Sequence, residues 1–167
     1  PSDKQVSPVD VIDNTAQWLT YTIRFQSTGT APAIDIYVID TLDAALDINS
    51  FQLLAYSHQP VVKVYNTERR VRFNFASIYL DDSLHNEPQS HGYIQYRIKT
   101  LPGLNCGTQI GNAAHIYFDF NPPVATNAAV NRIYMSSTTN LQNTICNGEQ
   151  FNFNVQLLST TGNYTDT

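Results

Sequence analysis

The chain has 167 residues, of which 42% are hydrophobic and 11% aromatic, enough apolar material for one well-packed core. Only 14% are charged, against roughly 25% in an average soluble domain. The net charge of −5 and the scattered basic residues argue against nucleic-acid binding. The sequence also excludes membrane insertion by a helix, because no apolar run approaches the roughly 20 residues that a spanning helix needs.

Alternating apolar and polar residues predict a series of short strands. In residues 18–25, the apolar side chains from Leu19 to Phe25 recur at every second position, as in a half-buried strand. Further strands are expected over 33–41, 51–57, 61–65, 71–75, 92–100, 109–120 and 128–134, with one helical turn over 43–48. About seven to eight short strands separated by turn residues predict an all-β fold, an immunoglobulin-like β-sandwich.

The C-terminal part differs from the rest of the chain. We expect the sandwich over 1–135, a polar linker over 136–148, and an additional strand and turn over 149–167. One strand and a turn cannot bury an apolar face alone. The strand must therefore pair with the sandwich, with a continuation of the chain, or with another subunit. For pairing between subunits, the alternating apolar residues would be Phe151, Phe153, Val155 and Leu157.

The sequence holds two cysteines, Cys106 and Cys146, and neither has metal-site spacing around it. A disulfide bond or two free thiols are the remaining alternatives. In a secreted protein we expect the disulfide.

Acidic side chains gather in two loop regions that could hold Ca²⁺, because this ion takes six to eight oxygen ligands. Neither region has an EF-hand pattern, and solvated acidic loops are the ordinary alternative. No other cofactor is expected. The calcium candidates are Asp40, Asp43, Asp47, Asp81, Asp82 and Glu87.

Lys4 is a candidate for an intramolecular isopeptide bond with an acyl group on a late strand, such as Asn121 or Asp119. Such a bond needs a buried, neutral amine and a carboxyl group for proton transfer, for which Glu87 is the spare acid. An exposed lysine in an ordinary ion pair is the alternative that we favour at this stage.

Catalysis is not expected. The four histidines share no metal spacing, and there is no Gly-x-Ser-x-Gly elbow. The chain is therefore expected not to be an enzyme. Trp18 and the ten tyrosines could form a carbohydrate platform, although most belong to strands and first indicate packing.

Several motifs, in one order, resemble a conserved-repeat domain of Bacteroidetes surface proteins, and the similarity runs from about Asp3 to Tyr134. The segment 145–149 with 160–165 resembles the opening of a second, smaller repeat type. The resemblance implies an extracellular module of proteins that are often exported by the type IX system, and it implies no reaction. The matching segments are 3–8, 19–31, 40–43, 86–92 and 116–123 with Thr126 and Asn127.

Two sites resemble the Bacteroidetes signal for O-glycosylation, which is Asp followed by Ser or Thr and an apolar residue. They predict modification of Ser83, within Asp82-Ser83-Leu84, and of Thr41, within Asp40-Thr41-Leu42.

Three functions stay open at this point. The first is a structural and adhesive module, a spacer or display domain whose partners are neighbouring domains of the same protein. The second is a subunit of an extracellular filament, assembled from identical subunits by strand addition through 149–167. The third, weaker alternative is a carbohydrate-binding module that contacts surface glycans.

Overall fold

The computed structural model describes residues 2–10, 13–135 and 141–164. Two units are present, Pro1–Ser136 and Ser137–Thr167, and each is described by itself. No helix in these described ranges is long and apolar enough to cross a membrane.

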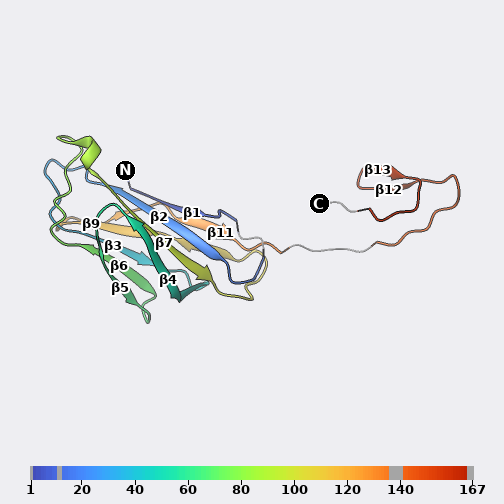
Figure 1. Cartoon of the computed structure of the whole chain (residues 1–167), viewed down its shortest axis with the longest axis horizontal. Helices are drawn as coiled ribbons and strands as arrows, with labels where there is room; N and C mark the ends of the chain where they lie inside the picture. The colour runs from blue at the N-terminus through green and yellow to red at the C-terminus, as the bar shows by residue number, and fades with distance from the viewer. Residues whose placement is uncertain (1, 11–12, 136–140, 165–167) are drawn as a thin grey trace. The chain divides into compact units, whose positions relative to one another are not determined.

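The first unit is an all-β sandwich, as the sequence predicted, built from antiparallel sheets (Figure 1). Its first sheet has the strand order β1-β2-β7-β4, and its second the order β10-β9-β3-β6-β5. The first sheet contains β1 (Asp3–Ser7), β2 (Trp18–Gln26), β7 (His91–Thr100) and β4 (Leu46–Tyr56). The second contains β10 (Val124–Ala125), β9 (Ala114–Phe118), β3 (Ile36–Thr41), β6 (Arg70–Phe75) and β5 (Val61–Tyr65).

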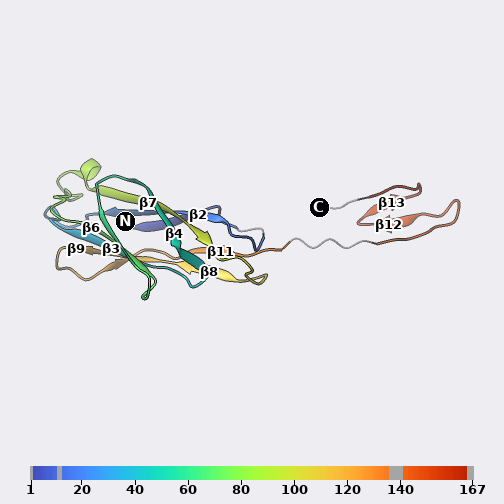
Figure 2. The same cartoon turned by 60° about the horizontal axis from the view of Figure 1, so that its bottom comes forward.

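A separate antiparallel pair, β8 (Gln109–Asn112) and β11 (Ala129–Arg132), continues the second layer. Figure 2 shows β2 and β7 above β8 and β11. The sequence predicted one strand over 109–120, but the structure divides it, because β8 pairs with β11 whereas β9 pairs with β3 and β10.

The core lies between the layers and consists of the inward side chains of the alternating strands. Leu19, Tyr21 and Ile23 of β2 are fully buried, and so are Ile94, Tyr96 and Ile98 of β7. Burial at every second residue is the pattern that the sequence indicated. The expected helical turn over 43–48 is wrong: Leu46 donates its N–H to the carbonyl of Asp43 in a short turn, and β4 begins at Leu46. Among the described residues, the helical structure is the 3-10 turn Glu87–Gln89.

The first and last strands of this unit, β1 and β11, lie beside each other and run in the same direction. The backbone of Lys4 and the side chain of Asn127 exchange two hydrogen bonds, of 2.9 and 2.8 Å. Further along both segments, the Asn131 amide donates to the carbonyls of Pro8, at 2.7 Å, and Val9. Side-chain amides thus bind the beginning of the unit to its end.

The second unit contains a short hairpin, β12 (Phe151–Phe153) and β13 (Gln156–Leu158), in which Phe151 pairs with Leu158. The prediction of one continuous strand is wrong. Asn154 and Val155 both adopt positive φ, 44° and 70°, and turn the chain at that point. Part of the expected linker over 136–148 lies outside the described residues.

Candidate functional site

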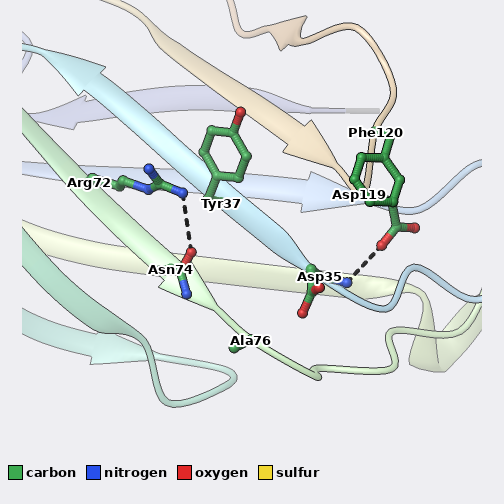
Figure 3. Close-up of a pocket in the computed structure, with 7 residues that line it drawn as sticks. All are labelled: Asp35, Tyr37, Arg72, Asn74, Ala76, Asp119 and Phe120. Atoms are coloured by element: carbon green, nitrogen blue, oxygen red, sulfur yellow. Dashed lines mark hydrogen bonds between the residues drawn. The ribbon is translucent and has the colours of Figure 1, made fainter.

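A shallow hollow on the outer face of the second sheet is the first candidate site (Figure 3). Tyr37 of β3 stacks on Tyr117 of β9 with ring centroids 4.3 Å apart, and the Arg72 guanidinium of β6 lies 4.2 Å from the Tyr37 centroid. Phe120 is fully exposed at the edge of the hollow. The hollow is lined by Asp35, Tyr37, Arg72, Asn74, Ala76, Asp119 and Phe120.

The two carboxylates in this hollow are occupied by loop backbone. Asp119 Oδ1 accepts the N–H groups of Ile34, at 2.9 Å, and Asp35, at 2.7 Å, and Asp35 Oδ1 accepts that of Ser77 at 2.7 Å. They therefore stabilise the loops instead of forming an acid–base pair. Because Tyr117 and Arg72 come from the strands on either side of β3, they cover the faces of the Tyr37 ring, and Phe120 is the exposed ring of this hollow.

A buried polar cluster between the two sheets is the second candidate site. Lys4 of β1 has its ammonium against Asp40 Oδ2 of β3, and the Tyr96 hydroxyl of β7 donates to the same oxygen at 2.6 Å. The Lys4 Nζ also lies 3.3 Å from that hydroxyl, to which Asn112 of β8 donates its Nδ2–H at 3.0 Å. Strands of both layers meet here, and the Lys4, Asp40, Tyr96 and Asn112 residues are at most 1% exposed.

Hydrogen bonding inside this cluster is incomplete. Six buried side-chain atoms have no hydrogen-bond partner among the described residues, and three of them, Asp40 Oδ1, Asn112 Oδ1 and the Tyr21 hydroxyl, belong here. Unpaired buried polar atoms are rare because each costs desolvation free energy. The Tyr21 hydroxyl is near Asn112, and the amide acts against the rise of its pKa, but their geometry is not that of a hydrogen bond. The cluster therefore calls for a chemical explanation.

Burial controls the protonation of these groups. Removal from water lowers the pKa of the Lys4 ammonium, and the adjacent Asp40 carboxylate acts against this fall. Burial, followed by the negative field of Asp40, raises the pKa of the Tyr21 and Tyr96 hydroxyls well above the ordinary value. The two tyrosines therefore stay neutral, and the amine of Lys4 is more easily deprotonated than in water.

The sequence identified Lys4 as a candidate for an isopeptide bond, but the acyl and acid groups that it suggested lie elsewhere in the structure. The sequence favours an exposed lysine, but Lys4 is buried and contacts Asp40. The proposed acid, Glu87, instead lies 2.8 Å from the His91 ring, and Asp119 caps a loop. Asn121 donates to the Phe118 carbonyl. Asp40 follows Val38 at the two-residue spacing of the inward face of β3, which could have indicated a buried carboxylate. That Tyr96 and Asn112 lie beside it depends on long-range strand pairing, which the sequence does not show.

The calcium candidates do not gather into one centre. Asp40 faces Lys4 in the core, and Asp43 accepts the N–H groups of Ala45 and Gly111. The others bind nearby groups: Asp47 accepts from Asn49, Asp81 from Asn86, Asp82 from Leu84 and His85, and Glu87 contacts His91. Within the described ranges, no group of three or more His, Cys, Asp or Glu side chains could hold a metal ion. The arrangement does not support a calcium site.

The remaining predicted positions are at the surface. Thr41 is exposed and Ser83 is partly exposed, so both O-glycosylation sites stay predictions. Cys106 and Cys146 are exposed and belong to different units, and a disulfide between them stays a prediction. In the hairpin, Val155 is 93% and Leu157 64% exposed, whereas Phe151 and Phe153 are partly buried.

Comparison with known families assigns the first unit. Residues 1–132 match the family described as Domain of unknown function (DUF7619). The chain belongs to this family. No curated protein matches the chain.

Solved structures similar to this DUF7619 chain include domains of adhesins and pilins. The N-terminal domain of the Streptococcus gordonii adhesin Sgo0707 is 15% identical with a TM-score of 0.56, covering 79% of this chain and 32% of that one. Domains D2 and D3 of the major pilin SpaD from Corynebacterium diphtheriae are 19% identical with a TM-score of 0.53, covering 78% and 51%.

The major pilin subunit BcpA*(D312A) of Bacillus cereus is 17% identical with a TM-score of 0.53, covering 80% of this chain and 40% of that one. The DUF7619 chain thus spans from about a third to half of the length of these structures. At such identities the likeness establishes the fold, an immunoglobulin-like β-sandwich.

Proposed function

We propose that this chain is a structural and adhesive module of a secreted bacterial surface protein, serving as a spacer or display domain outside the cell. The main support for this function is the arrangement of β1 and β11. Because these segments run in parallel at the two ends of the sandwich unit, a pull on its ends slides one along the other. The hydrogen bonds of Asn127 and Asn131 between them are then loaded together instead of one after another.

The comparisons support this function at the level of fold, since adhesin and pilin domains share the sandwich. The finer assignment rests on the sequence motifs: an origin in Bacteroidetes, export by the type IX system, and glycosylation at Ser83 and Thr41. In this proposal residues 1–135 bear load, 136–148 form a linker, and no reaction is catalysed.

Force spectroscopy tests the load-bearing role. The full chain is placed between two reference domains and pulled from both ends. We expect Asn127→Ala and Asn131→Ala to lower the unfolding force, because each removes hydrogen bonds between residues 4–9 and residues 127–131. Asn49→Ala, at an exposed position of β4, is the matched control. Equal unfolding forces in all variants would contradict the proposal.

A filament subunit is the second candidate, and the hairpin of the second unit favours it. A two-stranded hairpin is marginal alone, and Val155 and Leu157 are largely exposed. We propose that residues 149–167 add to the sheet edge of an identical subunit. Electron microscopy of the purified chain should then show filaments that disappear when 149–167 is deleted. Filaments that persist after the deletion would refute this mode of assembly.

A carbohydrate-binding module is a weaker third candidate, suggested by the hollow of Figure 3 with its exposed Phe120. A glycan array would show binding that Phe120→Ala abolishes and Tyr79→Ala, an exposed ring outside the hollow, leaves intact.

A further inference from the structure

The buried cluster of Lys4, Asp40, Tyr96 and Asn112 contains the parts of an acyl-transfer reaction. A buried lysine is a nucleophile once it loses its proton, and Asp40 is the base in direct contact with it. The carboxamide of Asn112 is the acyl group, held through Nδ2 by the same Tyr96 hydroxyl that Lys4 contacts. Nucleophile, base and acyl group therefore converge on one hydroxyl.

We propose that Lys4 and Asn112 join in an intramolecular isopeptide bond, with Asp40 as the proton carrier and Tyr96 as the positioning residue. The bond would link β1 of the first sheet to β8 of the second layer and close the chain into a ring between these residues.

The atoms of the reaction balance within the cluster. Lys4 passes one proton to Asp40, and the neutral Nζ attacks Cγ of Asn112. The bond from Cγ to Nδ2 breaks, and Nδ2 leaves as ammonia after taking a further proton from Nζ through the Asp40 carboxyl group. The first proton stays on Asp40. An ion pair and an amide become a secondary amide, a neutral carboxylic acid and free ammonia, and nothing is oxidised or reduced.

The unpaired oxygens of the cluster fit this reaction. Asp40 Oδ1 and Asn112 Oδ1 are both acceptors without a donor while Asp40 is ionised. A proton that passes from Lys4 to Asp40 supplies the cluster with a hydrogen-bond donor, which these two oxygens lack in the ionised state. Burial also excludes water, so the product amide is protected from hydrolysis.

Asn112 is a better acyl group than the other carbonyl groups near Lys4. A carboxylate such as Asp40 is a poor electrophile, and within the described ranges no second carboxyl group hydrogen-bonds to the cluster to serve it. Asn127 and Asn131 are also near β1, but their amides bind backbone groups of Lys4, Pro8 and Val9. Of the three asparagines, Asn112 is the one that shares a hydrogen-bond partner with the Lys4 amine.

Mass spectrometry of the full chain, denatured and with its thiols reduced, tests the proposal. We expect the intact mass to be lower than the sequence mass by one ammonia, and a protease digest to contain a branched peptide linking Lys4 to Asn112. Lys4→Met, Asp40→Ala and Asn112→Ala should each restore the full mass. Asn49→Ala, at an exposed position of β4 outside the cluster, should keep the loss.

Three results would overturn the proposal. They are a full sequence mass in the folded wild-type chain, an ammonia loss that persists in Lys4→Met, and a branched peptide through Asp40 with loss of water. The second result would indicate ring closure at another asparagine, such as Asn147 before Gly148. The digest of the wild-type chain shows by itself whether the branched peptide is present, so the test remains valid even when a variant fails to fold.

Discussion

Gly92 is a single residue on which the packing of the core depends. It pairs with Phe25 across β2 and β7, and a Cβ built at Gly92 would lie 2.2 Å from the Phe25 ring. Phe25 in turn contacts Phe75 and Phe118, with centroids 5.6 and 6.4 Å away. The absence of a side chain at Gly92 therefore lets this aromatic group span the sandwich.

We predict that Gly92→Ala destabilises the fold by about 1–3 kcal/mol, the usual cost of overpacking a core. Urea unfolding followed by tryptophan fluorescence measures the effect. Gly111→Ala is the matched control, because a Cβ there meets no atom within 4 Å. Equal midpoints for the two variants would show that Phe25 moves aside without cost.

The buried tyrosines predict a loss of stability in alkali. Burial raises the pKa of Tyr21 and Tyr96 in the folded state, while in the unfolded chain they ionise near pH 10.0. Above that pH the unfolded state binds fewer protons than the folded state, so stability falls as pH rises.

In Tyr21→Phe, the free energy of unfolding should fall less steeply with rising pH than in the wild type. The difference should be about 1.4 kcal/mol per pH unit, the value for one proton. At neutral pH the variant should be at least as stable as the wild type, because the Tyr21 hydroxyl has no hydrogen-bond partner among the described residues. Urea unfolding between pH 9 and 12, with the exposed Tyr93→Phe as control, measures both effects. If the free energy of unfolding has the same pH dependence in Tyr21→Phe and in the wild type, the raised pKa of Tyr21 is contradicted.

At the scale of elements, the hairpin β12–β13 depends on an unfavourable turn. Val155 is β-branched and has a φ of 70°, a region that such residues rarely adopt. Asn-Gly is the preferred sequence for a turn with two positive φ values. The native Asn154-Val155 turn therefore leaves the hairpin poorly stabilised.

We predict that Val155→Gly increases the population of the hairpin. Cross-strand NMR contacts between Phe151 and Leu158, which pair in the structure, should strengthen. Leu157→Gly, which places glycine within β13, should weaken them. Weaker contacts in Val155→Gly would mean that the valine side chain itself holds the hairpin.

Strand positions were predictable from sequence because half-buried strands alternate, and β5 follows the expected range of 61–65. The split of 109–120 was not predictable, since both halves alternate alike and only their partners differ. The hairpin was missed because Phe151 to Leu157 alternate through Asn154-Val155 without a glycine. Lys4 was identified from its place near the first strand, whereas Asn112 was not, because long-range pairing brings it to Tyr96.

At the scale of the whole molecule, the hydrophobic core is drawn from Leu19 to Ile133, so no core residue of the described chain lies beyond Ser136. We predict that a chain ending at Ser136 keeps the thermal midpoint of the full chain, as measured by calorimetry. Deleting Pro1 to Ser7 instead removes β1 and Lys4 and should lower it strongly, because Asp40 is left buried without its partner. A lower midpoint after loss of 137–167 would show that the tail contributes to the sandwich.

The ion pair of Lys4 also determines how the first strand is aligned. Only every second residue of β1 faces the core, so a slip by one residue would bring Asp3 or Gln5 towards Asp40 and move the lysine into water. Asp3 would repel Asp40, and Gln5 would leave its charge uncompensated. The ion pair thus favours one register of β1 over the registers shifted by one residue. Because β1 is an edge strand of its sheet, this preference also disfavours the attachment of a strand from another molecule in its place.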